Sequence, residues 1–274
     1  MNNLNDMVSI IDSISYDNVD FEIVAFNRLE GAQNIETAKH MFWANQAGLK
    51  MKQVRIRLNN SSVKTEAGSL YYYKGNIQSK SNIGSVGGLF KKAVSGRITH
   101  ESAIKSVYTG TGEIFLEPSY KYYIIMVLND ESIIVDKGMF YCCSQGINIK
   151  PFAQKNISST LLGGEGLFQI ELSGFGIVIL ESNVPKSEII EYEIRKGEVL
   201  KVDGNFAIAR TKDVNFSVTK SIKTFVGSAM IGEGLLNTFS GEGKVWIAIT
   251  QPIYEKIKHD IAISNNSMNN KTHS

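Results

Sequence analysis

Apolar and polar residues alternate over much of the chain, at the two-residue period of a β-strand. In one such stretch, Phe168, Ile170 and Leu172 alternate with Gln169 and Glu171. This pattern predicts a strand with one buried face and one face in contact with water. Most of the remaining sequence has the same character, with short strands separated by turns of Gly, Asn and Ser. The chain is therefore predicted to be all-β.

Three stretches are apolar on both faces of the predicted strand. They lie at 114–116, 178–180 and 245–247. Strands of this kind are covered on both sides. We therefore expect a second layer, supplied either by like units of the same chain around a shared pseudo-threefold axis or by another subunit.

A Gly-rich element occurs three times in the same internal order. Each copy joins a short motif around a glutamate to an x-Gly-x-Gly motif several residues later. The copies are "HESAI" with "TGTG" at 100–112, "GEGLF" with "SGFG" at 164–176, and "GEGLL" with "SGEG" at 232–243. We expect the glycines of each x-Gly-x-Gly motif to adopt positive φ in a tight hairpin.

A second landmark keeps the same period as the Gly-rich element. Gly68, Gly138 and Gly204 each precede a predicted strand, at intervals of about 66 to 70 residues. Two landmarks with one period predict three tandem β repeats. The repeat domain spans 49–250, with units at approximately 49–118, 119–183 and 184–250.

Helices are predicted on both sides of the repeats. The N-terminal extension, 1–48, contains a helix near 35–47, which Asn34 caps and Gly48 ends. Its apolar stripe comprises Ile35, Ala38, Met41 and Phe42.

Residues 251–274 form a C-terminal helix and a disordered tail. Pro252 begins this helix, and Ile253, Ile257 and Ile261 recur at four-residue spacing. We expect both helices to pack over a sheet edge.

The composition is that of an ordinary globular protein. The 274 residues are 43% hydrophobic and 20% charged, with a net charge of +2, which does not favour nucleic-acid binding. The N-terminus has no signal-peptide pattern and no long apolar run is present, so we expect a cytoplasmic location. Adjacent Cys142 and Cys143 would point to opposite faces of a strand, so we expect them to be reduced thiols.

The sequence offers little catalytic chemistry. Four histidines are too dispersed for a catalytic dyad or a zinc set, so we expect no enzymatic activity and no cofactor. Glu101, Glu165 and Glu233 occupy equivalent repeat positions, and threefold geometry would bring them together around a cation. The alternative is a solvated glutamate at the start of each strand.

Short apolar insertions precede each glutamate motif. Their large side chains are candidates for a contact surface with a protein partner, a second copy of the chain or a membrane. The alternative is that they plug the ends of the sheet layers. These side chains are Leu89, Phe90, Leu162, Phe225 and Met230.

The chain resembles the altered inheritance of mitochondria 24 family, a group of mitochondrial biogenesis proteins with many bacterial members. The resemblance covers about 49–250 and rests on "AGSLYYYKGNI", "GGLFKKAVSG", "LLGGEGLFQIELSGFGIVIL" and "IGEGLLNTFSGEGKVWIAI". The chain departs from the family pattern at "THESAI" in the first repeat and in its N-terminal extension. The resemblance has two further implications. It implies a fold similar to that of the tryptophan RNA-binding attenuation protein, a TRAP-like short variant of the double-stranded β-helix, and no catalytic residues.

Together these observations predict a non-enzymatic scaffold or interaction protein that forms homo-oligomers or binds a protein partner, with peripheral membrane contact as a further option. The alternative is a nucleic-acid or small-ligand binding module, which the implied fold suggests by analogy.

Overall fold

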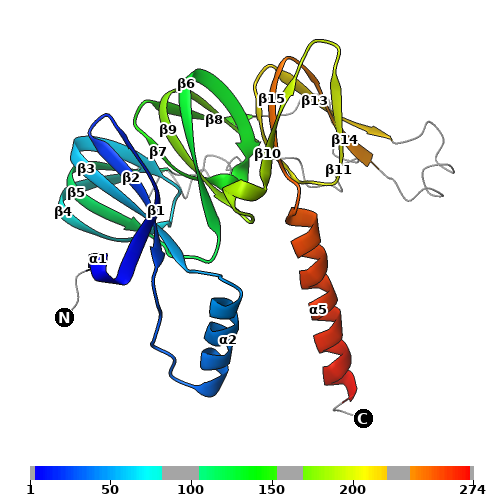
Figure 1. The fold of residues 1–274 in the computed structure, drawn as a ribbon. Helices are drawn as coiled ribbons and strands as arrows, with labels where there is room; N and C mark the ends of the chain where they lie inside the picture. The colour runs from blue at the N-terminus through cyan, green and yellow to red at the C-terminus, as the bar shows by residue number, and fades with distance from the viewer. Residues whose placement is uncertain (1–3, 82–104, 153–168, 221–234, 272–274) are drawn as a thin grey trace, which may run out of the picture. The chain divides into compact units, whose positions relative to one another are not determined.

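The structure is a computed structural model that describes residues 4–81, 105–152, 169–220 and 235–271. Most of these residues lie in β-strands, which confirms the all-β class (Figure 1). The strands are β1 (Val8–Tyr16), β2 (Val19–Phe26), β3 (Lys52–Thr65), β4 (Leu70–Ser81), β5 (Ser106–Leu116), β6 (Tyr122–Asp136), β7 (Phe140–Ser144), β8 (Ile147–Phe152), β9 (Gln169–Ser182), β10 (Ile189–Ile194), β11 (Val199–Asp203), β12 (Ala207–Thr211), β13 (Val214–Lys220), β14 (Leu235–Gly241) and β15 (Gly243–Ala248).

The chain divides into two compact units. The N-terminal unit holds 1–131, 137–151 and 172–182, and the C-terminal unit holds the remaining residues. Strands β6, β8 and β9 therefore contribute residues to both units.

In the N-terminal unit, β1, β2, β3, β5 and β4 pair in that order, and every pair is antiparallel. The end of β3 also pairs with β7, which pairs with β9. The sequence did not predict β1 and β2, which lie in the N-terminal extension. A buried ion pair lies in this sheet between Arg55 of β3 and Glu22 of β2, and Arg57 Nη1 lies 2.9 Å from the other oxygen of Glu22.

In the C-terminal unit, the end of β6 pairs with β12, β12 with β15, and β15 with β10. A separate three-stranded sheet has the order β11, β14, β13. Side chains from both sheets form one apolar core, which includes Val202, Phe216, Phe239, Val245 and Ile247.

The strands that the sequence predicts to be covered on both faces are buried. All residues of 114–116 and 178–180 are buried, as are Val245 and Ile247. Trp246 is half-buried. The expectation of a covered second face is therefore confirmed for the first two stretches and for most of the third.

The glycines of the x-Gly-x-Gly motifs have positive φ, as expected, but they do not form hairpins. Gly110 and Gly112 have φ of 142° and 154° inside the continuous strand β5, and Gly174 and Gly176 lie likewise within β9. The prediction of a tight hairpin is wrong because the strand bends here while it crosses very close to its neighbour. A Cβ on Gly112 would overlap the carbonyl oxygen of Lys74 in β4.

The two longer helices are α2 (Ile35–Gln46) and α5 (Gln251–Lys271), and a short helix α1 spans Leu4–Met7. The Asn34 cap is confirmed, since Thr37 N donates to Asn34 Oδ1 at 2.8 Å. Helix α5 continues into the segment for which a disordered tail was expected.

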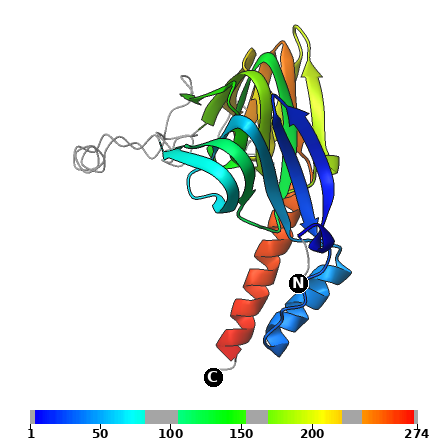
Figure 2. The same cartoon turned by 90° about the vertical axis from the view of Figure 1, so that its left-hand side faces the viewer.

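The expectation that these helices pack over a sheet edge is wrong for most of their apolar residues. No residue of α2 is buried, and both Ile35 and Phe42 are exposed. Helix α5 extends away from the strands of its own unit, as Figures 1 and 2 show. The β core is built almost entirely from strand residues, and these helical side chains stay at the surface.

We expect Gly112→Ala to destabilise the fold by about 2–4 kcal/mol, because the residue needs φ of 154° and its new Cβ would lie 3.0 Å from Gly75 Cα and overlap a backbone oxygen. Urea unfolding of the full chain measures this change. Gly31→Ala is the control, since a Cβ there has no atom within 4 Å, and it should change stability by no more than about 0.5 kcal/mol. Equal stability of the two variants would contradict the close crossing.

Candidate functional site

The sequence-predicted site residues all lie outside the described residues. The three glutamates that could share a cation are Glu101, Glu165 and Glu233, and they fall in 82–104, 153–168 and 221–234. The same segments contain the candidate contact side chains, which are Leu89, Phe90, Leu162, Phe225 and Met230. Both sets therefore stay predictions.

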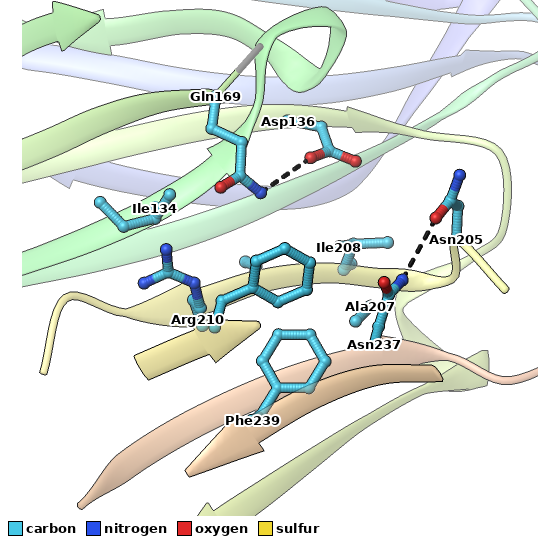
Figure 3. Close-up of a pocket in the computed structure, with 11 residues that line it drawn as sticks. Ile134, Asp136, Gln169, Asn205, Ala207, Ile208, Arg210, Asn237 and Phe239 are labelled. Atoms are coloured by element: carbon cyan, nitrogen blue, oxygen red, sulfur yellow. Dashed lines mark hydrogen bonds between the residues drawn. The ribbon is translucent and has the colours of Figure 1, made fainter. Parts of the chain in front are cut away.

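A pocket lies within the C-terminal unit, lined by residues of β6, β9, β12, β13 and β14 (Figure 3). It is small, about 70 Å³ in volume, which suits a few water molecules or a small ligand. The lining mixes apolar side chains with charged and amide groups. It comprises Ile134, Asp136, Gln169, Asn205, Ala207, Ile208, Ala209, Arg210, Phe216, Asn237 and Phe239.

Asp136 and Gln169 form the acidic end of the pocket. Gln169 Nε2 donates to Asp136 Oδ1 at 3.2 Å (Figure 3). Burial raises the pKa of the Asp136 carboxyl, and the hydrogen bond from Gln169 offsets only part of this effect. The other amide atom, Gln169 Oε1, is buried and accepts no hydrogen bond within the described part of the chain.

Arg210 supplies a positive charge to the same lining. Arg210 is only 3% exposed, and its Nη1 donates to the carbonyl oxygen of Val214 at 2.9 Å. The guanidinium carbon lies 5.2 Å from the centroid of the Phe152 ring, within cation–π range. Burial lowers the pKa of Arg210 to about 10, so the side chain remains a cation at neutral pH.

Amide and aromatic groups complete the wall. Asn237 Nδ2 donates to Asn205 Oδ1 at 3.2 Å (Figure 3). It also donates to the carbonyl oxygen of Gly204 at 2.9 Å. The rings of Phe216 and Phe239 pack with centroids 5.1 Å apart. The pocket therefore offers a cation, a carboxyl, a free amide oxygen and an apolar wall, which are groups that bind and orient a small polar molecule.

Sequence reasoning missed this pocket, although one signal was present. In "FAIART" at 206–211, Arg210 interrupts an apolar strand at a position that is buried. A charged residue inside an otherwise apolar strand indicates a special environment. Asp136 and Gln169 gave no comparable signal, because they are brought to Arg210 by pairing between strands distant in sequence.

Helix α5 presents the clearest exposed apolar stripe among the described elements. Ile253, Ile257 and Ile261 are 56%, 51% and 55% exposed, and Tyr254 is exposed beside them. Their spacing places the three isoleucines along one side of the helix. This stripe, Ile253 with Tyr254, Ile257 and Ile261, is called the α5 stripe below.

Within the described ranges, no helix combines the length and the apolar character that crossing a membrane requires. The same ranges contain no group of three or more His, Cys, Asp or Glu side chains placed to hold a metal ion.

Comparison with known proteins gives consistent matches. The model of the family described as Mitochondrial biogenesis AIM24 matches residues 45–249. An uncharacterized protein of Streptococcus pyogenes serotype M6 is 24% identical over 199 residues, which cover 69% of this chain and 77% of that protein. The crystal structure of a Streptococcus pyogenes protein matches with a TM-score of 0.51 and 22% identity, covering 73% of this chain and 88% of that one. At this identity the structural match shows a shared fold alone.

The family match confirms the resemblance drawn from the Gly-rich motifs, and it spans well over half of the 274 residues. The chain belongs to the Mitochondrial biogenesis AIM24 family.

Proposed function

We propose that this protein is a non-enzymatic interaction protein of the cytoplasm, which forms homo-oligomers and acts through protein contacts. The observation that carries the proposal is the α5 stripe, in which three isoleucines stand more than half exposed on one side of a helix. Full burial of one such side chain contributes about 1.5–3 kcal/mol. A partner that covers the stripe therefore gains substantial binding free energy.

The charges of α5 favour a protein partner over a lipid surface. Glu255 and Asp260 balance Lys256 and Lys258 near the stripe. Interfacial helices that bind anionic membranes carry an excess of Lys and Arg on their polar face. Mixed charges around an apolar stripe are typical of helices that pack against other helices.

The buried cysteines support the cytoplasmic part of the proposal. Cys142 and Cys143 are both free and buried in β7. Burial raises the pKa of the Cys143 thiol to about 12, which keeps it protonated and unreactive at neutral pH. Unbonded thiols are typical of reducing compartments.

We also infer that the β domain consists of three tandem repeats of a TRAP-like, double-stranded β-helix type. Local geometry supports this inference, because Gly112, Gly176 and Gly243 share φ between 143° and 154°. A Cβ on each would clash with a residue of an earlier strand, β4, β7 or β12, and those residues recur at the repeat interval. They are Lys74, Ser144 and Thr211. A common pseudo-threefold axis remains a prediction.

We expect the double substitution Ile257→Gln with Ile261→Gln to reduce self-association at least tenfold, because it removes apolar area that only a partner would cover. Light scattering coupled to size exclusion, over a range of protein concentrations, measures the mass. The matched control is His259→Gln with Ala262→Gln, at exposed positions on the other side of α5.

Two results would contradict the proposal. One is a wild-type chain that stays monomeric at every concentration. The other is a wild-type chain that binds phosphatidylserine-containing vesicles through the α5 stripe without associating, which would make the stripe a membrane contact.

A second candidate function is small-ligand binding, which the pocket specifically favours. Gln169 Oε1 is a buried acceptor with no partner in the described ranges, and the adjacent Asp136 carboxyl accepts a hydrogen bond from Gln169 Nε2. A buried acceptor without a partner costs about 1–3 kcal/mol. A small molecule with N–H or O–H groups would satisfy both oxygens, with its apolar part against Phe216 and Phe239.

We expect Asp136→Asn to raise the thermal unfolding midpoint at pH 7 and to leave it unchanged near pH 3. Burial raises the pKa of Asp136 in the folded protein, so the folded state binds this proton more tightly than the unfolded chain does. Ionisation at neutral pH therefore costs stability, and the cost is absent below the ordinary Asp pKa of about 4. Asparagine keeps an acceptor for Gln169 Nε2.

The control for this measurement is Asp213→Asn, at an exposed position of the same unit. Native mass spectrometry of the purified chain gives the functional readout. A retained small molecule that is lost in Asp136→Asn would support the ligand site. A destabilised Asp136→Asn variant at pH 7 would show that the carboxylate is structurally paired and would contradict this candidate.

A further inference from the structure

Strands β4 and β10 leave one edge unpaired within the described residues. Strand β4 pairs with β5, and β10 pairs with β15, and neither has a second strand partner there. Each edge therefore presents a row of backbone N–H and C=O groups that another strand can pair with. Other strands also end a sheet, but these two combine an exposed tyrosine with charges of a single sign.

The two edges carry opposite charge. Strand β4, "LYYYKGNIQSKS", contains Lys74 and Lys80 and no acidic residue. Strand β10, "IIEYEI", contains Glu191 and Glu193 and no basic residue. Because like charges directly opposite each other are destabilising in a sheet, two β4 edges or two β10 edges repel. A β4 edge facing a β10 edge is attracted.

The side chains of the two edges also match face by face. On β4, Tyr73 lies opposite the core residue Ile114, while Lys74 is on the other face, opposite Glu113. Tyr73 is nevertheless exposed, since it lies at the edge. The core face of β4 therefore ends in an uncovered aromatic ring, and its other face ends in a lysine.

Strand β10 has the complementary arrangement. Ile190 and Tyr192 lie opposite the core residues Ile247 and Val245, and both are exposed. Glu191 and Glu193 are on the other face. Joined in antiparallel register with their core faces on the same side, the two edges would place Tyr73 opposite Tyr192 and Lys74 opposite Glu191.

We propose that β4 of one copy pairs with β10 of a second copy, in an antiparallel register that continues the sheet between them. The proposal rests on the self-association proposed above and names a surface other than the α5 stripe for it. Every strand pair whose register the structure defines is antiparallel, so this direction repeats the local rule.

The interface is heterologous, because it joins two different surfaces. Each bound copy keeps one free β4 edge or one free β10 edge, so assembly continues until the copies close into a ring or extend as a filament. The opposite charges of the two edges, with Lys74 facing Glu191, set the pairing, and the backbone hydrogen bonds and apolar contacts supply the affinity.

A charge-swap experiment tests this pairing on the full chain. Variant one carries Lys74→Glu and Lys80→Glu, so both of its edges are acidic. Variant two carries Glu191→Lys and Glu193→Lys, so both of its edges are basic. All four side chains are exposed, and the thermal unfolding midpoint of each variant checks that it is folded, because Glu191 pairs with Lys244 within the sheet.

We expect each variant alone to lose at least tenfold in association constant by sedimentation velocity. An equimolar mixture should regain the wild-type mass distribution, since each edge then finds an opposite charge. A control with Lys150→Glu and Lys201→Glu, which reverses two exposed lysines on β8 and β11, should associate like the wild type.

The outcomes separate this inference from the proposed function. If wild-type protein associates and both variants associate equally well alone, the edge pairing is wrong, while self-association through the α5 stripe stands. If the mixture fails to associate although both variants are folded, the edge pairing is again overturned. A wild-type chain that never associates overturns both proposals.

Discussion

The fold depends on the close crossing of neighbouring strands at the x-Gly-x-Gly motifs. At Gly112 and Gly176 the chain has φ near 150° and passes so near the adjacent strand that no Cβ fits. Only glycine meets both conditions, because L side chains rarely adopt this φ and every other residue adds an atom at the point of contact. The crossing bends the long strands β5 and β9. The two ends of a bent strand run in different directions and can pack against different neighbours. The two-sided burial of 114–116 and 178–180, just after these glycines, is therefore a consequence of the bend.

The sequence predicted those parts of the fold that depend on local pattern. Alternation identified the strands, the Asn34 cap located the start of α2, and the all-apolar stretches identified doubly covered segments. It misread the x-Gly-x-Gly motif, because positive φ in glycine is compatible both with a hairpin and with a bend in a continuous strand. Strand pairing over long distances decides between the two. It also missed β1 and β2, since most of β1 is exposed and gives no clean alternation, although its partner β2 is almost fully buried.

The candidate site was harder to predict for a related reason. The pocket joins Asp136, Gln169 and Arg210, which lie on three strands far apart in sequence. No motif spacing in the sequence shows that these three residues are neighbours, so only the unusual charge of Arg210 within an apolar strand could be recognised from the sequence.

The apolar stripes of the helices were predicted correctly but were assigned to packing, because periodicity shows which side of a helix is apolar and not what covers it. In α5 that side is exposed, as is the rest of the helix over 252–263, so the stripe supports a binding hypothesis in place of the packing expectation.

Carboxylates removed from water are handled differently in the two units, and the difference bears on the ligand-binding candidate. In the N-terminal unit, Glu22 is held by both Arg55 and Arg57, so the cost of burying its carboxylate is offset by two cations. In the C-terminal unit, Asp136 receives a hydrogen bond from a neutral amide, and burial raises its pKa. Replacing such a carboxyl with an uncharged residue would increase the stability of the fold. A destabilising polar group beside a pocket is typical of binding sites, where the ligand supplies the missing interactions. The Glu22 network is therefore best explained as structural, and Asp136 is the acidic residue whose cost a ligand could offset.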